Sequence, residues 1–504
     1  MRRKNVAANF ASQIGLAAAN IAFLPIFLRL MGAEAYGLVG VFALLNAALQ
    51  LLDGGLSLTL GREAARFRAG TMDAAALRRL VRTVEAFFAI TATASATLLA
   101  LTAHPLAHLW LRPRRLSEET VAVAVLLMGL SAPLQWMTGP YRGLLNGFER
   151  QVALAACNLA AAVLRFPGGA LALVLFGPSP TVFFGWQAGV SVCELAALAW
   201  MAHLALPPAS RDRRAFATAA ELRPLMGVSG GLGLAVVVWT AATQVDKVVL
   251  SRVLPLADFG VFTVAVTAAS AVTLAAAPIS QALMPRLTHI AAIDDEEGLR
   301  RLYRQATQMI AALSLSAALC LALFAAPLVA AWTGEPAVAA RAAPILAPYA
   351  LGNAAANLAA FGYYLQYARG DLRLHVFGNL GLAAAGIPAI ALAAARFGAV
   401  GAAWAWLGLN VVYLAVMIPL VHRRLAPGLN RRWFESDLLP IGLAASGATF
   451  VLWRLLANGA AGAPGLASAL GGGAVLLLSA GLASSFLRER LAVLTKAVRK
   501  AKPA

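Results

Sequence analysis

The stretch that decides the fold is residues 23–68, FLPIFLRLMGAEAYGLVGVFALLNAALQLLDGGLSLTLGREAARFR. It holds the end of one apolar run, a tight connection from Gly32 to Gly37, a second apolar run and a basic cluster. One acid, Asp53, lies inside the second run beside two glycines. An apolar run of about 20 residues can cross the hydrocarbon of a bilayer as a helix. The stretch therefore predicts a transmembrane helical hairpin.

The composition extends this prediction to the whole chain. Of its 504 residues, 61% are hydrophobic and 12% are charged, whereas a soluble protein carries about 25% charged residues. Aromatic residues make up only 8% and alanine is abundant, so the apolar runs are predicted to be helices rather than the alternating strands of an outer-membrane barrel. The predicted fold class is all-α, and the protein is predicted to be a polytopic membrane protein.

Fourteen apolar runs are candidate membrane spans, and no connection between them is long enough to form a separate domain. They are 8–30, 36–59, 84–104, 119–138, 152–176, 181–204, 224–248, 258–282, 306–331, 342–364, 374–395, 399–421, 437–456 and 465–487. The first run follows Met1-Arg-Arg-Lys with no small-residue cleavage site, which predicts an uncleaved anchor.

The distribution of Lys and Arg predicts the orientation. An even number of spans puts both termini on one side, and 31 of the 41 basic residues lie on the termini and the even-numbered connections. Only eight lie on the opposite side. Because cytoplasmic loops are enriched in Lys and Arg, both termini are predicted to be cytoplasmic. The same bias accounts for the net charge of +19, so no nucleic-acid partner is predicted.

An internal repeat divides the spans. LRRLVR at 77–82 recurs as LRRLYR at 299–304, and Asn158-Leu159 recurs as Asn379-Leu380. In the opening stretch, Arg29 corresponds to Arg252. The number of residues between the two copies is almost the same for all three motifs, and each interval contains six predicted spans. Because six is even, both copies enter the membrane in the same direction, so the repeat is parallel.

The repeat predicts three parts of the chain: an N-terminal six-helix bundle at 1–210, a second six-helix bundle at 211–430, and two extra spans with a basic tail at 431–504. Two such halves form the usual alternating-access transporter, with a substrate site between them. Two basic segments, 62–82 and 284–305, are expected to be amphipathic helices lying along the inner membrane surface.

Nothing in the sequence predicts a cofactor, a metal site or catalytic residues. The three cysteines lie inside apolar runs and imply no disulfide framework. The six histidines show no metal-ligand spacing.

The opening stretch and its second copy resemble a known family. The matching features are PIFLRLMGAEAYGL, LLDGGLS and GREAAR in the first half, and QVDKVVLSRVLPLADFGVFTVA with GAVGAA at 398–403 in the second. They are similar to the polysaccharide and O-antigen flippases of the multidrug/oligosaccharidyl-lipid/polysaccharide exporter superfamily. The resemblance covers most of residues 8–425.

The resemblance implies the function. Members have twelve to fourteen helices in two bundles and move a lipid-linked oligosaccharide, typically undecaprenyl-pyrophosphate-linked, across the inner membrane for polysaccharide or O-antigen (lipopolysaccharide) biosynthesis. The implied partners are that substrate, membrane lipids, and a polysaccharide polymerase and glycosyltransferases.

Charged residues inside spans are the candidate site residues, because each costs about 2.5–3.5 kcal/mol on insertion scales. Arg165 and Glu194 are the deepest. One interpretation is a structural ion pair. In the other, Arg165 binds the pyrophosphate through its guanidinium fork, and Glu194 is a proton-coupling candidate.

Three further arginines are substrate-binding candidates. Arg29 and Arg252 could hold an anionic head group at the outer ends of their spans. The alternative is that each side chain extends to the membrane interface, where water solvates its charge. Arg142, at the inner end of the fourth span, could receive the same head group, but the positive-inside bias explains it equally well.

The remaining candidates are two acids and a lysine. Asp53 is either a cavity-facing carboxylate for a proton or cation at a helix bend, or a group that reaches cytoplasmic water. Asp246 is an ion-coupling candidate and Lys247 a substrate-binding one. As neighbours on a helix they are expected to point in different directions, and a contact within the bundle explains them equally well. Glu85, three residues after Arg82, is expected to form a surface pair with it.

Three alternatives stay open at this stage. The first is a cation-coupled multidrug exporter of the same superfamily, and the second is a peptidoglycan lipid flippase. The third is a membrane-embedded glycosyltransferase or polysaccharide polymerase. Such enzymes usually carry acidic catalytic residues on a large outer loop, whereas the longest outer connection here, 105–118, is short and basic, which disfavours this alternative.

Overall fold

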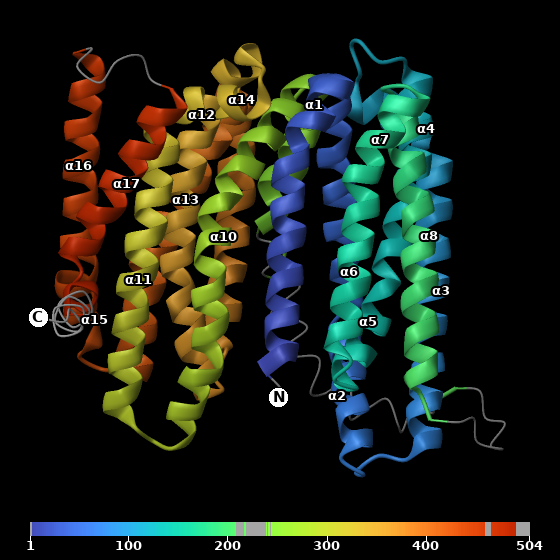
Figure 1. Cartoon of the computed structure of the whole chain (residues 1–504), viewed down its shortest axis with the longest axis horizontal. Coiled ribbons are helices and arrows are strands. Elements are labelled where there is room, and N and C mark those ends of the chain that lie inside the picture. The colour runs from blue at the N-terminus through green and yellow to red at the C-terminus, as the bar shows by residue number, and fades with distance from the viewer. Residues whose placement is uncertain are drawn as a thin grey trace, which may run out of the picture. The chain divides into compact units, whose positions relative to one another are not determined.

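The computed structural model describes residues 3–207, 216–217, 238, 240–241, 243–458 and 465–489. Throughout these residues the regular structure is helical, with no β-strand. The chain forms two compact units, Met1–Gly260 and Val261–Ala504. The all-α prediction is therefore confirmed (Figure 1).

The first unit contains eight helices whose bounds are described, together with the start of α10. They are α1 (Arg3–Asp53), α2 (Leu56–Arg68), α3 (Ala74–Pro105), α4 (Glu118–Trp136), α5 (Thr138–Gly147), α6 (Gln151–Arg165), α7 (Pro167–Phe176) and α8 (Pro180–Ala205). A π-helical turn, Leu106–Leu111, extends α3. A further helical segment ends at residue 253, just before α10 (Leu256–Ala292).

The second unit is built from helices whose bounds follow. After α10 come α11 (Glu296–Leu323), α12 (Ala325–Thr333), α13 (Pro336–Arg369), α14 (Arg373–Leu425), α15 (Leu429–Arg432), α16 (Leu439–Ala457) and α17 (Leu466–Ala483). A π-helical segment, Trp433–Leu438, joins α15 to α16.

Ten helices among the described residues are long and apolar enough to cross a membrane. The two longest helices, α1 and α14, each consist of two helical segments joined at one glycine, and the two segments correspond to consecutive predicted spans. In α1 the join is Gly32 (φ 83°, ψ 167°), and in α14 it is Gly398 (φ 60°, ψ −147°). Positive φ is open to glycine at little cost, which explains these joins. The predicted span 224–248 falls mostly outside the described residues.

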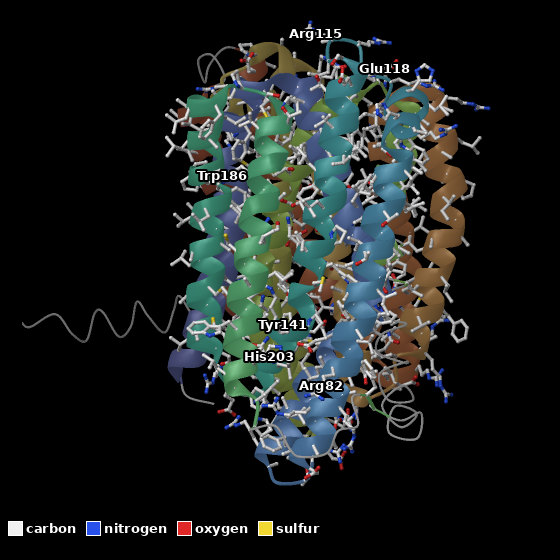
Figure 2. The ribbon with its side chains drawn as sticks, turned by 90° about the vertical axis from the view of Figure 1, so that its right-hand side faces the viewer. Arg82, Arg115, Glu118, Tyr141, Trp186 and His203 are labelled. Carbon is white, nitrogen blue, oxygen red and sulfur yellow. The ribbon has the colours of Figure 1, made fainter. Side chains whose placement is uncertain are left out.

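The predicted connection from Gly32 to Gly37 is shorter in the structure than expected. Helical geometry resumes directly after Gly32, and Glu34 lies in the first turn of the second segment. The buried Glu34 carboxylate accepts backbone N–H groups from Arg114, at 2.5 Å, and Arg115, at 2.8 Å. It thereby ties the loop before α4 to the hairpin, on the side where Figure 2 labels Arg115.

Gly37 and its repeat counterpart Gly260 make reciprocal close contacts within the first unit. A Cβ at Gly37 would lie 2.3 Å from the carbonyl oxygen of Leu256, and a Cβ at Gly260 would lie 1.9 Å from that of Ala33. Leu256 is the repeat counterpart of Ala33, because the same interval of sequence separates the two glycines. The two copies of the motif thus pack against each other symmetrically, at a distance that only glycine allows.

The backbone also shows the repeat. Arg112 (φ 44°) and Gly334 (φ 70°) both have positive φ, and they are separated by the same interval as the two LRRL motifs. Positive φ also recurs at the interval between Asn158 and Asn379 in two further pairs, which are Glu149 with Gly370 and Gly177 with Gly398. Breaks in helical geometry therefore recur at equivalent positions, in two of the three pairs with different residue types, which supports the six-span parallel repeat.

The two basic segments are not single surface helices, so that prediction was wrong. Segment 62–82 ends α2, turns through Gly70 (φ 75°) and restarts as α3, whose N-cap Asp73 accepts two backbone N–H groups. Segment 284–305 likewise turns between α10 and α11 at Asp294 (φ 54°). The helical spacing of apolar and basic residues continues through both segments and therefore predicted one helix in each. The turn and N-cap residues within them end one helix and start the next.

The last two helices dock on α11 through buried polar groups. Asp437 is fully buried and accepts two hydrogen bonds from Arg304, at 2.7 and 2.9 Å. The side chain of Gln308 bonds both Asp437 (2.7 Å) and Ser484 (2.7 Å). These bonds fix the extra helices to the second unit.

Candidate functional site

Three charged side chains from three helices meet inside the first unit. Arg142 lies in α5, Arg165 is the last residue of α6, and Glu194 lies in α8. Arg165 Nη2 donates to Glu194 Oε2 over 2.5 Å, and Arg142 Nη2 donates to Glu194 Oε1. One carboxylate is thus held between two guanidinium groups. We call these three residues the charge cluster.

A helix break places Arg165. Pro167 occupies the first turn of α7 and has no backbone N–H, so α6 ends at Arg165. Gln187 of α8 then binds Arg165 twice. It accepts from Arg165 Nη1 at 3.2 Å and donates to the Arg165 carbonyl at 3.2 Å. The second bond satisfies a carbonyl at the C-terminal end of α6.

Arg142 is held by side chains on two helices. Its Nε donates to Thr138 Oγ1 over 3.1 Å, one turn earlier in α5. Its Nη1 donates to Asn158 Oδ1 of α6. With the bond to Glu194, all three nitrogens of this guanidinium have acceptors, which fixes its position.

A layer of neutral polar groups lies beside the charge cluster. The Ser191 hydroxyl lies 3.4 Å from Arg165 Nη2 and 3.1 Å from the Ser131 hydroxyl, and it accepts from Gln135 Nε2 at 3.2 Å. Ser191 also donates to the Gln187 carbonyl one turn earlier. The arginines therefore lie in a polar network rather than in hydrocarbon.

Because the charge cluster is largely buried, the loss of any one of its members is costly. The exposed fraction of the side chain is 5% for Glu194, 13% for Arg165 and 32% for Arg142. Removing one partner of a buried pair costs about 3–5 kcal/mol, because the other charge is left uncompensated. Two guanidinium groups share one carboxylate, so the charge cluster carries one net positive charge. Arg142 is its most accessible member.

A structural ion pair between Arg165 and Glu194 was one of the two interpretations of the sequence, and the structure shows that pair. The sequence did not reveal the neutral partners of the charge cluster, which are Thr138, Asn158, Gln187 and Ser191. One signal could have found two of them. Gln187, Ser191 and Glu194 recur at spacings of four and three residues, so they share one face of α8.

The two predicted outer arginines lie elsewhere in the first unit. Arg29 is exposed in the first segment of α1. The exposed Arg252 places its guanidinium over the ring of Trp110, with Cζ 5.1 Å from the ring centroid. The hydrogen bonds and ion pairs described for the charge cluster involve neither arginine, so their role at an outer mouth remains a prediction.

Asp246 and Lys247 bond to each other, contrary to the expectation that they point in different directions. Lys247 Nζ lies 3.2 Å from Asp246 Oδ1 and donates to the Thr243 carbonyl at 3.0 Å. Asp246 is 1% exposed. The long lysine side chain curls back along its helix, which the angular separation of adjacent residues does not prevent.

Asp53 ends α1, and its side chain bonds Ser57 in the first turn of α2. Its Oδ1 accepts from the Ser57 hydroxyl at 2.6 Å and lies 3.3 Å from the Ser57 backbone N. Gly54 and Gly55 both have positive φ, so the helix is interrupted there, as the bend predicted. In the second copy of the repeat, Pro278 was expected to weaken the helix at the equivalent depth. The structure shows that α10 runs unbroken through Pro278, so the break at Asp53 is not repeated there.

Near one end of the first unit, Figure 2 shows Tyr141 and His203 close together. Their ring centroids are 6.1 Å apart, and His203 Nε2 lies 2.9 Å from Glu85 Oε1. Glu85 therefore pairs with α8 rather than with Arg82, which corrects the expected surface pair. The tertiary partner lies on a neighbouring helix that sequence spacing does not reveal.

The profile of a protein family described as "Polysaccharide biosynthesis protein" matches residues 3–291. The chain belongs to this family. The match includes the whole charge cluster and most of the first repeat. No curated relative matches the chain.

Solved structures share the fold. A structure titled "Lipid II flippase MurJ, inward closed conformation" is 14% identical, covers 97% of this chain and 99% of its own, and has a TM-score of 0.70. An inward-facing multidrug resistance MATE family transporter of the MOP superfamily is 14% identical, with 85% and 98% coverage and a TM-score of 0.68. A Vibrio cholerae MATE transporter is 17% identical, with 84% and 100% coverage and a TM-score of 0.53. The chain therefore has the fold of these polytopic membrane transporters.

Proposed function

We propose that the protein is a flippase that moves an anionic lipid-linked oligosaccharide across the bacterial inner membrane by alternating access. Its substrate would carry an undecaprenyl-pyrophosphate carrier, and its product would enter polysaccharide or O-antigen biosynthesis. Both termini would be cytoplasmic. A polymerase and glycosyltransferases would act on the same lipid, and the protein itself would have no catalytic residues.

The charge cluster carries this proposal. Two guanidinium groups share one carboxylate, which leaves one net positive charge in the charge cluster. Guanidinium forks match phosphate oxygens bidentately. Arg142, the most exposed member, would exchange Glu194 for a phosphate oxygen, while Arg165 would keep its bond to Glu194. The buried carboxylate would thus never be left without a cation.

Glu194 would then compete with the phosphate for Arg142. Protonation of Glu194 would weaken its hold on the arginine, which is why we propose it as an ion-coupling group. Asp53 and Asp246 remain candidates for coupling, and Arg29, Arg252 and Lys247 for contacts to the head group.

The second candidate function is a cation-coupled multidrug exporter. The likeness to MATE transporters favours it, as do buried acids such as Asp246. A cationic drug would be repelled by the net positive charge of the charge cluster, and an anionic head group would be attracted. We therefore prefer the lipid-linked substrate.

The test is flipping of a lipid-linked sugar by full-length protein in proteoliposomes. Arg142→Gln keeps the buried Arg165–Glu194 pair, so folded protein is expected to persist while flipping falls at least about tenfold. Arg165→Ala removes the more buried partner and is expected to abolish flipping.

The matched control is Arg68→Gln, which breaks an ion pair between Arg68 and Glu149 outside the membrane spans. It should flip at the wild-type rate. Normal flipping by folded Arg142→Gln and Arg165→Ala proteins would remove the charge cluster from the substrate path. Selective export of a cationic dye, with no flipping, would favour the exporter.

A further inference from the structure

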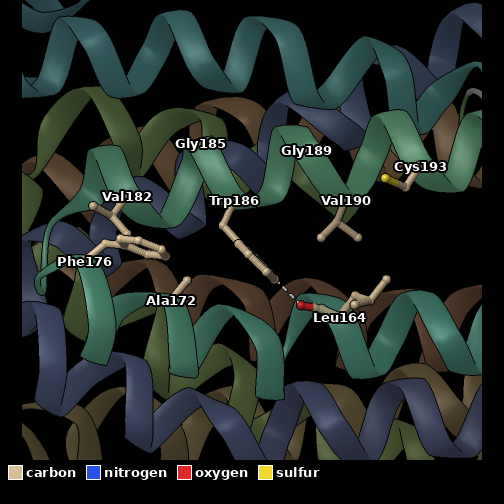
Figure 3. A pocket seen from close by; sticks show the side chains of 9 residues that line it. All are labelled: Leu164, Ala172, Phe176, Val182, Gly185, Trp186, Gly189, Val190 and Cys193. Atoms are coloured by element: carbon tan, nitrogen blue, oxygen red, sulfur yellow. Dashed lines mark hydrogen bonds between the residues drawn. The ribbon is translucent and has the colours of Figure 1, made fainter.

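An apolar groove runs along the outside of α8, beside the α6–α7 break. Its volume is about 470 Å³, and no charged side chain lines it. Figure 3 shows Phe176 and Val182 at one end and Cys193 and Leu164 toward the other. The stretch from Val182 to Cys193 spans about 16 Å of helix. The groove is therefore long and narrow.

Small residues on α8 open the groove. Gly185, Gly189 and Cys193 are spaced by four residues and share one face of the helix. A Cβ at Gly189 would meet no atom within 4 Å, and a Cβ at Gly185 would meet only Leu127 Cδ1, at 4.0 Å. The space above both glycines is thus empty in the folded unit. It forms a row of recesses about 6 Å apart.

Trp186 closes the groove from the inside. Figure 3 shows its ring reaching from α8 to the facing helix, where Nε1 donates to the Leu164 carbonyl over 2.7 Å. Its ring packs so closely on Gly168 that a Cβ there would lie 3.0 Å from Cζ2. The ring is therefore fixed, and the groove is part of the fold rather than a gap between mobile side chains.

The groove and the charge cluster occupy adjacent faces of the same helices. Leu164 lines the groove and Arg165 belongs to the charge cluster. Likewise Cys193 lines the groove and Glu194 belongs to the charge cluster. Trp186 similarly precedes Gln187, a ligand of Arg165. The charge cluster, with its one net positive charge, therefore lies at the same depth as the Cys193 end of the groove, on a different face of α8.

We propose that this groove binds the chain of a polyprenyl phosphate lipid, with the phosphate directed toward the charge cluster. The proposal rests on the function proposed above, because it concerns the carrier of that substrate. Charge complementarity selects an anionic head, and the uncharged walls select an apolar tail. An isoprenoid tail carries regularly spaced methyl branches, and these fill a row of recesses better than an unbranched acyl chain does.

Photolabelling of the full-length protein in nanodiscs tests the groove directly. The probe is undecaprenyl phosphate carrying a diazirine on its chain, and labelled peptides are mapped by mass spectrometry. In wild-type protein, label is expected within residues 164–193. Gly189→Leu places a side chain in the recess above Gly189 and is expected to reduce that labelling at least tenfold. Gly185→Leu should act in the same direction.

The matched control is Gly408→Leu, in the exposed face of α14, where a Cβ also meets nothing within 4 Å. It should leave labelling unchanged. Equal labelling by an acyl-chain diazirine phospholipid, or labelling unaffected by both groove variants, would show that bulk lipid fills the groove and would overturn the proposal.

Flipping is measured separately, so the two proposals can fail independently. Groove-specific labelling without any flipping by wild-type protein would reject the flippase function and leave a polyprenyl-binding site. Flipping without groove-specific labelling would keep the function and reject the groove.

Discussion

At the residue scale, buried acids hold this protein together by gathering donors from other helices. Glu194 gathers two arginines, Asp437 binds Arg304 and Gln308, and Glu34 binds backbone N–H groups of a loop. An unpaired charge at these depths would be costly, so each acid determines which helices are adjacent.

A surface ion pair gives a prediction about pH. Arg68 Nη1 lies 3.0 Å from Glu149 Oε1, and its hydrogen bond lowers the pKa of Glu149 below the ordinary 4.5. Because the folded pKa is the lower one, this pair stabilises the fold above pH 4.5, and the stabilisation is lost as pH falls through the folded pKa. Both side chains are nearly half exposed, so the effect is small.

The measurement compares melting temperatures of wild type and Glu149→Gln between pH 3.5 and 7. The variant should be slightly less stable at neutral pH, and the difference should narrow as the pH falls below 4.5. A difference that stays constant with pH would contradict the assigned ion pair.

At the element scale, the helices are positioned by glycines at close contacts and breaks. Gly37 and Gly260 bring α1 against the start of α10, Gly32 and Gly398 join successive spans, and Gly55 separates α1 from α2. Helix breaks at Asp53 and at Pro167 also fix where the candidate side chains lie. Element boundaries thus decide which polar groups can meet.

The reciprocal glycine contact gives a prediction about stability. Gly260→Ala would place Cβ 1.9 Å from the Ala33 carbonyl oxygen, so α1 and α10 must separate. Overpacking of this kind costs about 1–3 kcal/mol. A lower melting temperature is expected for Gly260→Ala and for Gly37→Ala.

Gly442→Ala in α16 serves as the comparison, because a Cβ there meets nothing within 4 Å. It should be neutral or slightly stabilising, since alanine is the better helix former. If all three variants had the same stability, the close approach would not be a constraint in the native protein.

At the scale of the whole molecule, charge asymmetry and repetition describe the chain. Basic residues gather on one set of connections, and the backbone repeats its positive-φ positions at the same intervals as the sequence motifs. A duplicated six-span unit accounts for the repetition, and the enrichment of Lys and Arg in cytoplasmic loops accounts for the predicted charge asymmetry.

The orientation can be tested with reporter fusions. Because 31 of 41 basic residues lie on one side, a fluorescent protein fused after Ala504 should be active, and alkaline phosphatase fused in the loop at 112–117 should be active as well. The reverse pattern would contradict the assigned orientation, and two fusions that report the same side of the membrane would contradict the number of spans between them.

The sequence alone determined the class of protein and its family, and it predicts the positions of the spans and of the repeat. These are sums or patterns along the chain, because hydropathy, basic-residue bias and self-similarity depend on residues close in sequence. It also identified Arg165 and Glu194 as candidates, because charges inside apolar runs stand out, and Arg142 from its place at the inner end of the fourth predicted span.

Only the tertiary structure decided which of these meet. The positive-inside bias alone could explain an arginine at position 142. In the structure Arg142 and Arg165 both bond Glu194, because the faces of α5, α6 and α8 that carry these three side chains pack together. The groove beside Trp186 and the contact between Gly37 and Gly260 likewise depend on the rotation and relative depth of helices. Local sequence does not set those quantities, because they result from the packing of every neighbouring side chain at once.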